Sequence, residues 1–210
     1  MKRPWLAAML LAIVCLAGCG KTQTLAQNTW QRVDYLPADM AVEFLAALDL
    51  TPGEIAMADT GALGIVRELT FTEDGTCRFG CSSDATRSLA RAYLDTLFTT
   101  LAANPADLAG DYNETFGVDM SAMDEDACKA FYAEIFACAD YEALLDHLAD
   151  AMFDYGALSA AGEVRQFTAR GGKLFFTDSD GADLGCVKFT LADDGLTLHY
   201  GTTTEDYKKA

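Results

Sequence analysis

Two stretches of alternating apolar and polar residues, far apart in the chain, constrain the fold more than any other feature. Residues 65–81 alternate on either side of a turn at Asp74-Gly75, and residues 164–200 alternate around turns at Gly171-Gly172 and Asp194-Gly195. A period of two places successive side chains on opposite faces of a strand. An Asp-Gly pair between alternating runs favours a tight hairpin. The sequence therefore predicts antiparallel hairpins in two groups.

Two further segments are candidates for strands. Trp30–Tyr35 precedes the first group, and residues 54–58 form a short run that reads as another strand. With both included, the sequence predicts up to eight strands.

Between the two groups of hairpins, residues 83–158 repeat large apolar side chains every three or four positions, as helices do. The pattern is clearest over residues 89–101, 131–136 and 144–155. Strands, helices and then strands again are typical of an α+β domain. We expect one domain, residues 30–210, in which the hairpins form a curved sheet or partial barrel with a helical insert at about 83–158.

The N-terminus has the pattern of an export signal. Met1-Lys2-Arg3 is basic, residues 5–17 carry no charge, and small residues precede Cys19. The apolar run is too short to cross a hydrocarbon core of about 30 Å comfortably as a helix. This combination predicts a signal peptide over residues 1–18.

The four residues Leu16-Ala17-Gly18-Cys19 resemble the lipobox of bacterial lipoproteins. The resemblance implies a diacylglyceryl group on the Cys19 thiol and cleavage before this residue. Residues 19–29 would then form the lipidated cysteine and a tether, and the protein would lie on the extracytoplasmic face of the cell membrane. Gly20 stands where an Asp would retain a lipoprotein at a Gram-negative inner membrane, so an outer-membrane location stays open. An ordinary secretory signal or an uncleaved anchor is the alternative.

The chain is strongly acidic, and the acidity is uneven. Its formal net charge is −17, and removal of residues 1–18 with Lys2 and Arg3 makes it −19. A basic footprint for nucleic acid is absent from such a composition, so we expect no nucleic-acid partner. Residues 92–164 hold fifteen Asp and Glu but one base, Lys129.

Within this acidic segment, Asp146, Asp150 and Asp154 recur at intervals of four residues. On one helix they would form an exposed stripe. Such a stripe is either a solvated face that keeps the protein soluble or a docking face for a cationic partner.

No pattern of catalytic or metal-binding residues emerges. His147 and His199 are far apart and in no zinc-binding spacing, and no nucleophile or phosphate-loop motif is present. Residues 111–122 match a calcium loop only in part, with Phe116 and Ala122 at the positions that require Gly and Glu. We therefore predict no catalytic residue, no metal site and no cofactor. The five cysteines after Cys19 are odd in number and are expected to be mainly buried free thiols: Cys77, Cys81, Cys128, Cys138 and Cys186.

Trp30 on the first strand, the hairpins that follow it and the Glu73–Thr76 turn are together similar to the lipocalin-like barrels of many bacterial lipoproteins. This resemblance implies a small apolar ligand held inside the barrel, with Trp30, Phe71 and Phe189 as candidate lining residues. The alternative function is a protein-interaction or structural module that uses the acidic helices, and an enzyme is the third possibility.

Overall fold

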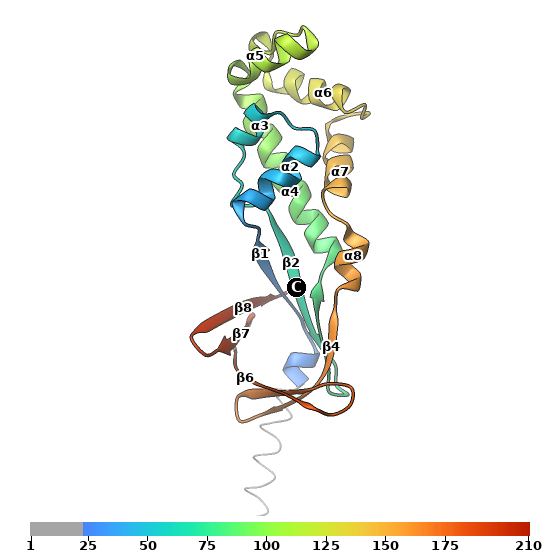
Figure 1. The fold of residues 1–210 in the computed structure, drawn as a ribbon, viewed down its shortest axis with the longest axis vertical. Helices are drawn as coiled ribbons and strands as arrows, with labels where there is room; N and C mark the ends of the chain where they lie inside the picture. Colours follow the sequence, from blue (N-terminus) through green and yellow to red (C-terminus); the bar gives the residue numbers. More distant parts are fainter. Residues whose placement is uncertain (1–22) are drawn as a thin grey trace, which may run out of the picture. The chain divides into compact units, whose positions relative to one another are not determined.

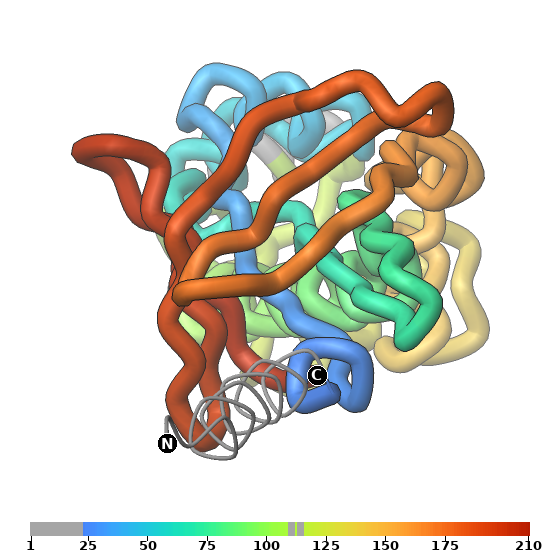
Figure 2. Tube along the Cα trace, turned by 90° about the horizontal axis from the view of Figure 1, so that it is seen from below, coloured from blue at the N-terminus to red at the C-terminus, as the bar shows by residue number. Residues whose placement is uncertain are grey.

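In the computed structural model, eight strands close into an antiparallel barrel. The structure describes residues 23–210 except the side chains of residues 109–111 and 113–115. The strands are β1 (Thr29–Tyr35), β2 (Gly64–Phe71), β3 (Thr76–Cys81), β4 (Glu163–Arg170), β5 (Lys173–Thr177), β6 (Asp183–Leu191), β7 (Gly195–Tyr200) and β8 (Thr203–Lys209). Figure 1 shows the strands along the chain, and Figure 2 shows β4, β5 and β6 (orange) running side by side.

The predicted α+β class with antiparallel hairpins is confirmed, and the sheet closes into a complete barrel where the sequence suggested a curved sheet or partial barrel. Closure depends on the pairing of the first strand with the last, in which Trp30 lies opposite Lys209. A closed barrel leaves no strand with an unpaired edge. Closure thus satisfies backbone groups that an open sheet would expose.

The Asp74-Gly75 turn forms as its sequence requires. Gly75 has a φ of 86°, a conformation that favours glycine. Its carbonyl accepts a hydrogen bond of 2.6 Å from the backbone N–H of Phe167, and an added Cβ would lie 3.2 Å from the Phe167 carbonyl oxygen. Glycine here therefore fits both the turn and the close approach of β4.

The described residues divide into two units. The barrel unit consists of the residues up to Arg32, Arg67–Ser82 and Ser159–Ala210, and the helical unit consists of Val33–Val66 and Ser83–Leu158. Because β1, β2 and α8 each contain residues of both, the units are joined by continuous elements.

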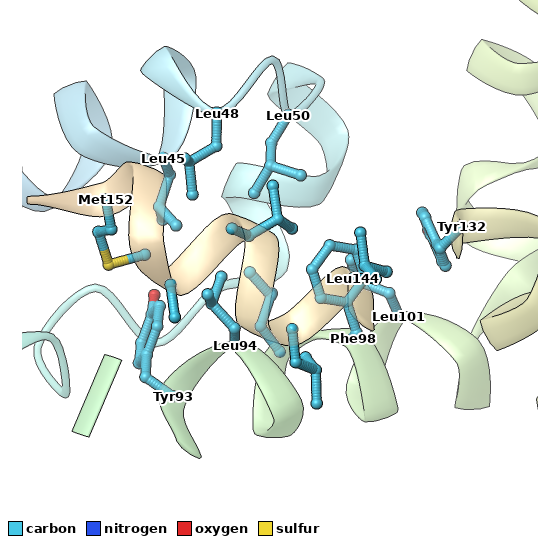
Figure 3. Close-up of a cluster of buried hydrophobic side chains, with 14 of the residues drawn as sticks. Leu45, Leu48, Leu50, Tyr93, Leu94, Phe98, Leu101, Tyr132, Leu144 and Met152 are labelled. Atoms are coloured by element: carbon cyan, nitrogen blue, oxygen red, sulfur yellow. The ribbon is translucent and has the colours of Figure 1, made fainter. Parts of the chain in front are cut away.

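The helical unit contains α2 (Ala38–Ala47), α3 (Pro52–Met57), α4 (Ser83–Ala103), α5 (Pro105–Phe116), the 3₁₀ helix η1 (Met120–Ala122), α6 (Glu125–Ile135) and α7 (Tyr141–Met152), and α8 (Tyr155–Ala160) begins in it. Leu45, Leu94, Leu101 and Leu144 from α2, α4 and α7 are completely buried. They point toward one another in the core that Figure 3 draws. The helical insert is confirmed, and α2 and α3 belong to the same unit although they precede it in the chain.

Residues 54–58, expected to be a strand, lie mostly in α3. The Thr51 hydroxyl accepts a hydrogen bond from the Glu54 N–H, and the Glu54 carboxylate accepts one of 2.6 Å from the Thr51 N–H. Pro52 occupies the first turn of the helix, where its missing N–H costs nothing. The strand prediction was wrong because this capping box outweighs the short apolar run.

The chain enters the barrel earlier than expected. Residues 23–26 form a helical turn, Leu25 is completely buried, and the Trp30 indole donates a hydrogen bond of 3.2 Å to the Leu25 carbonyl. Part of the segment assigned to a tether (residues 19–29) therefore packs into the barrel. The signal peptide and Cys19 lie outside the described residues.

Candidate functional site

The barrel interior brings together the three residues expected to line a pocket. Trp30 from β1, Phe71 from β2 and Phe189 from β6 belong to one buried cluster, with 0%, 3% and 7% of their surfaces exposed. The cluster also contains Leu25, Leu69, Cys77, Phe167, Leu174, Phe176, Val187, Leu196, Leu198 and Tyr207. Residues from distant parts of the sequence thus meet in one aromatic and aliphatic interior.

This interior is densely filled around Trp30. Leu69, Leu196 and Leu198 are, like Trp30, completely buried, so none of them borders a space that could admit water. The ring centroids of Phe71 and Phe167 lie 4.9 Å apart in an edge-to-face arrangement. An eight-stranded barrel is just wide enough to be filled by side chains or to hold one small ligand. The end of the barrel at which Leu25 and Thr29 lie is called the base.

The end opposite the base is called the far end, and the interior becomes polar toward it. Arg165 on β4 forms two hydrogen bonds with Glu163, of 2.7 and 2.6 Å. Its guanidinium also lies 4.9 Å from the ring centroid of Phe79 and 5.8 Å from that of Phe176. Arg165 therefore covers two aromatic rings of the interior while its charge is balanced by a carboxylate.

A second arginine–glutamate pair belongs to the same layer. Arg32 on β1 lies 3.0 Å from the Glu205 carboxylate on β8, and its guanidinium is 5.4 Å from the ring centroid of Tyr207. We call the two pairs, Arg32–Glu205 and Arg165–Glu163, the charged layer. The sequence analysis did not predict the charged layer. A signal was present, because Arg32 lies two residues from Trp30 and Arg165 two residues from Phe167, so each arginine shares a strand face with a buried aromatic residue.

Protonation in and below the charged layer follows from burial and charge. Burial raises the pKa of the Cys77 thiol to about 12, although Arg165 opposes the shift. Burial likewise raises the pKa of Tyr200 to about 12. The hydrogen bonds from Arg165 lower the pKa of Glu163. At neutral pH the thiol therefore stays protonated and is a poor nucleophile.

The acidic residues predicted to form one stripe do not do so. Asp146 and Asp150 lie on α7, but Asp154 lies beyond its end and accepts a hydrogen bond of 2.8 Å from the Ala157 N–H. The stripe prediction was wrong at Asp154, because α7 ends at Met152 and a new helix starts.

Two arginines of α4 occupy the same surface as the α7 carboxylates. Arg87 lies within hydrogen-bond distance of Asp146 and Asp150, and Arg91 lies 3.1 Å from Asp146. Hydrogen bonding with Arg87 lowers the pKa of Asp150 and raises that of Arg87. These carboxylates therefore connect α7 to α4. Arg87 and Arg91 were missed as partners, although their spacing of four residues places them on one helical face.

The helical unit also contains a buried carboxylate. Glu54 is 1% exposed, and its carboxylate accepts one hydrogen bond from the Thr51 N–H and a short one from the Tyr112 hydroxyl. Burial, followed by the hydrogen bond to Glu54, raises the pKa of Tyr112. This group connects α3 to α5 and is enclosed, so it acts as a structural contact.

An open hollow of about 500 Å³ lies on the surface of α6 and the start of α7. Asp126, Glu134, Cys138 and Tyr141 line it, and the Lys129 ammonium lies 5.2 Å from the Tyr141 ring centroid. Across the part of the chain that the structure describes, no group of three or more His, Cys, Asp or Glu is arranged to hold a metal ion.

The five cysteines among residues 23–210 form no disulfide, as expected, but only Cys77 and Cys128 are buried; Cys81 and Cys138 are partly exposed, and Cys186 is exposed. Among residues 23–210, no helix combines the length and the apolar character needed to cross a bilayer.

Comparison with known proteins adds no assignment: no family model, curated protein or solved structure matches the chain.

Proposed function

We propose that this protein is a lipid-anchored extracytoplasmic binding protein, without catalysis, whose barrel holds a small apolar ligand. The observation that carries the proposal is the closed barrel that unites Trp30, Phe71 and Phe189 in one aromatic interior. The lipobox-like sequence that ends at Cys19 supports the anchor.

The packing of the interior restricts where a ligand would bind. The completely buried residues around Trp30 fill the base, whereas Phe176, in the half of β5 nearer the far end, keeps 4% of its surface exposed. A ligand would therefore lie against this ring, below the charged layer. The limited space favours a small molecule that displaces side chains on entry.

Trp30 offers a direct test of ligand binding. The sequence has two tryptophans, and Trp5 lies in the predicted signal peptide, so Trp30 is the single tryptophan of the mature chain. An apolar ligand in the barrel should change the emission of Trp30 on titration. Phe176→Ala should alter the affinity, whereas Phe131→Ala in the helical unit should not. Absence of a bound small molecule in native mass spectra of protein from its own host, together with no response to apolar probes, would contradict the proposal.

The anchor is tested separately. Cys19→Ala should move the protein out of the membrane fraction, because two or more acyl chains are what hold a lipoprotein durably. Persistence of the variant in the membrane fraction would contradict lipidation at Cys19.

A second candidate function is a protein-interaction module, favoured by the charge of the helical unit. This unit holds 21 Asp and Glu against three Lys and Arg. Asp126 and Glu134 are exposed and line the hollow on α6. Asp126→Lys with Glu134→Lys should abolish capture of a cationic partner, and unchanged capture would exclude this surface.

A further inference from the structure

Three basic side chains stand next to one another on the outer face of the barrel. Arg170 ends β4, Lys173 begins β5 and Lys188 lies in β6, and the strand register places Arg170 opposite Lys173 and Lys173 opposite Lys188. Their neighbours Leu174 and Val187 are buried in the interior, so the basic side chains face outward. We call Arg170, Lys173 and Lys188 the basic row.

The basic row is unfavourable for the barrel by itself. Like charges directly opposite one another across two strands repel. Among the described residues, none of the three forms an ion pair with a carboxylate; Arg170 instead lies 4.7 Å from the ring centroid of Phe175. By contrast, Arg32 and Arg165 in the same unit each have a glutamate partner. Three adjacent cations without acidic partners indicate a surface for an anionic partner.

The position of the basic row indicates which partner. Because consecutive strands alternate in direction, the Gly171-Gly172 turn between Arg170 and Lys173 lies at the base, the end at which Thr29 begins β1. Leu25 is buried at this same end. The four residue steps from Cys19 to residue 23 span at most about 14 Å even when fully extended. A lipid on Cys19 would therefore hold the base, and with it the basic row, close to the membrane surface.

We propose that the basic row binds the phosphate groups of anionic lipids in the membrane that holds the anchor. This inference rests on the proposed lipidation of Cys19 for its location, but the contact itself is electrostatic. The acyl chains limit the distance of the barrel unit from the bilayer, and the basic row orients its β4–β6 side toward the headgroups. Basic residues close to an anionic leaflet each strengthen membrane binding, and salt screens the effect.

The test uses the unlipidated mature chain, residues 20–210, which contains every described residue. Its co-sedimentation is measured with vesicles of phosphatidylcholine alone and with vesicles that contain one quarter phosphatidylglycerol, at low salt. The variant Arg170→Gln/Lys173→Gln/Lys188→Gln removes three positive charges. A matched control, Ala38→Glu/Ala106→Glu/Ala127→Glu, changes the net charge by the same amount at exposed positions in the first turns of helices, where Glu is favourable.

The mature chain should partition onto anionic vesicles and not onto neutral ones, and high salt should release it. The basic-row variant should lose roughly tenfold to hundredfold in partition coefficient, whereas the control should keep most of its binding. Equal losses in the two variants would mean that net charge alone matters and would overturn the proposal. So would binding to a soluble polyanion such as heparin without any preference for anionic vesicles. Since Cys19 carries no lipid in this assay, its outcome is independent of the anchoring test.

Discussion

The two units of this protein differ in their balance of acidic and basic residues. The described barrel unit holds eleven Asp and Glu and nine Lys and Arg, whereas the helical unit holds 21 Asp and Glu and only three Lys and Arg. In the barrel unit, two arginines toward the far end each have a glutamate partner, whereas the three cations of the basic row on the outer face form no ion pair among the described residues. In the helical unit, all three bases are paired with carboxylates and most acids have no basic partner available. A single net charge for the chain therefore hides two surfaces suited to partners of opposite sign.

The units can first be compared through their cores. Leu198 in the barrel and Leu94 in the helical unit are both completely buried, so truncating either to Ala leaves a cavity. Each variant should lose about 2–5 kcal/mol of unfolding free energy. Urea denaturation would be followed by Trp30 fluorescence for the barrel and by far-ultraviolet circular dichroism for the helices.

Because β1 and β2 contain residues of both units, each variant is expected to lower the midpoint of both signals together. If Leu198→Ala lowered the fluorescence midpoint and left the dichroism midpoint unchanged, the units would be shown to unfold independently.

The next largest effect is expected at the buried carboxylate of the helical unit. Tyr112→Phe removes the hydroxyl that donates to Glu54, which is 1% exposed, and leaves a carboxylate oxygen without that donor. The loss should be about 1.5–3 kcal/mol, measured by urea denaturation.

Tyr93→Phe is the matched control, because the buried Tyr93 hydroxyl has no hydrogen-bond partner within the described part of the chain. Its removal should be neutral or slightly stabilising. A comparable loss in both variants would show that ring packing, and not the hydrogen bond to Glu54, determines the result.

The smallest effect is expected at the exposed pairs between α4 and α7. Arg87 lowers the pKa of Asp150, so the pair stabilises the folded state above the ordinary aspartate pKa of 3.8, and the contribution is lost as pH falls through the lowered value. Arg87→Gln should cost less than about 1 kcal/mol at pH 7, because the pair is solvent-exposed.

The difference in stability between the wild-type protein and Arg87→Gln should shrink as the pH of the thermal denaturation series falls below 3.8, and it should disappear once Asp150 is protonated in both. A difference that persisted unchanged at that pH would assign the effect to packing of the Arg87 side chain.

Much of the fold follows from local patterns in the sequence. The Asp74-Gly75, Gly171-Gly172 and Asp194-Gly195 turns join adjacent strands as predicted, because each hairpin is specified by a few neighbouring residues. The helical insert was predicted for the same reason, since the apolar period of a helix lies within one segment.

The eighth strand shows what local patterns miss. β8 (Thr203–Lys209) has Tyr207 as its one buried residue, so its sequence carries little of the alternation that identifies a strand. One of its two partners, β1, lies at the opposite end of the described chain. The expected count of eight strands included residues 54–58, which are helical in part, and omitted this one.

The candidate site was predicted in part. Trp30, Phe71 and Phe189 share one interior because all three follow the inward alternation of their strands. The Arg32–Glu205 pair was not predicted, because it requires knowing that β1 and β8 are neighbours around the barrel. The Arg165–Glu163 pair and the basic row were not predicted either, although their residues lie on one strand or on consecutive strands. The pairing of Arg87 with Asp146 and Asp150 likewise required the packing of α4 against α7.

The sequence by itself determined the hairpins, the helical insert, the uneven acidity and the lipobox-like motif, because each is encoded within a short segment. Only the tertiary structure decided that the barrel closes, that Leu25 packs into its base, and that Arg32 lies beside Glu205. These features arise from contacts between residues far apart in the chain. Such contacts form because burying apolar side chains and pairing strand edges together outweigh the entropy lost on bringing distant segments into register.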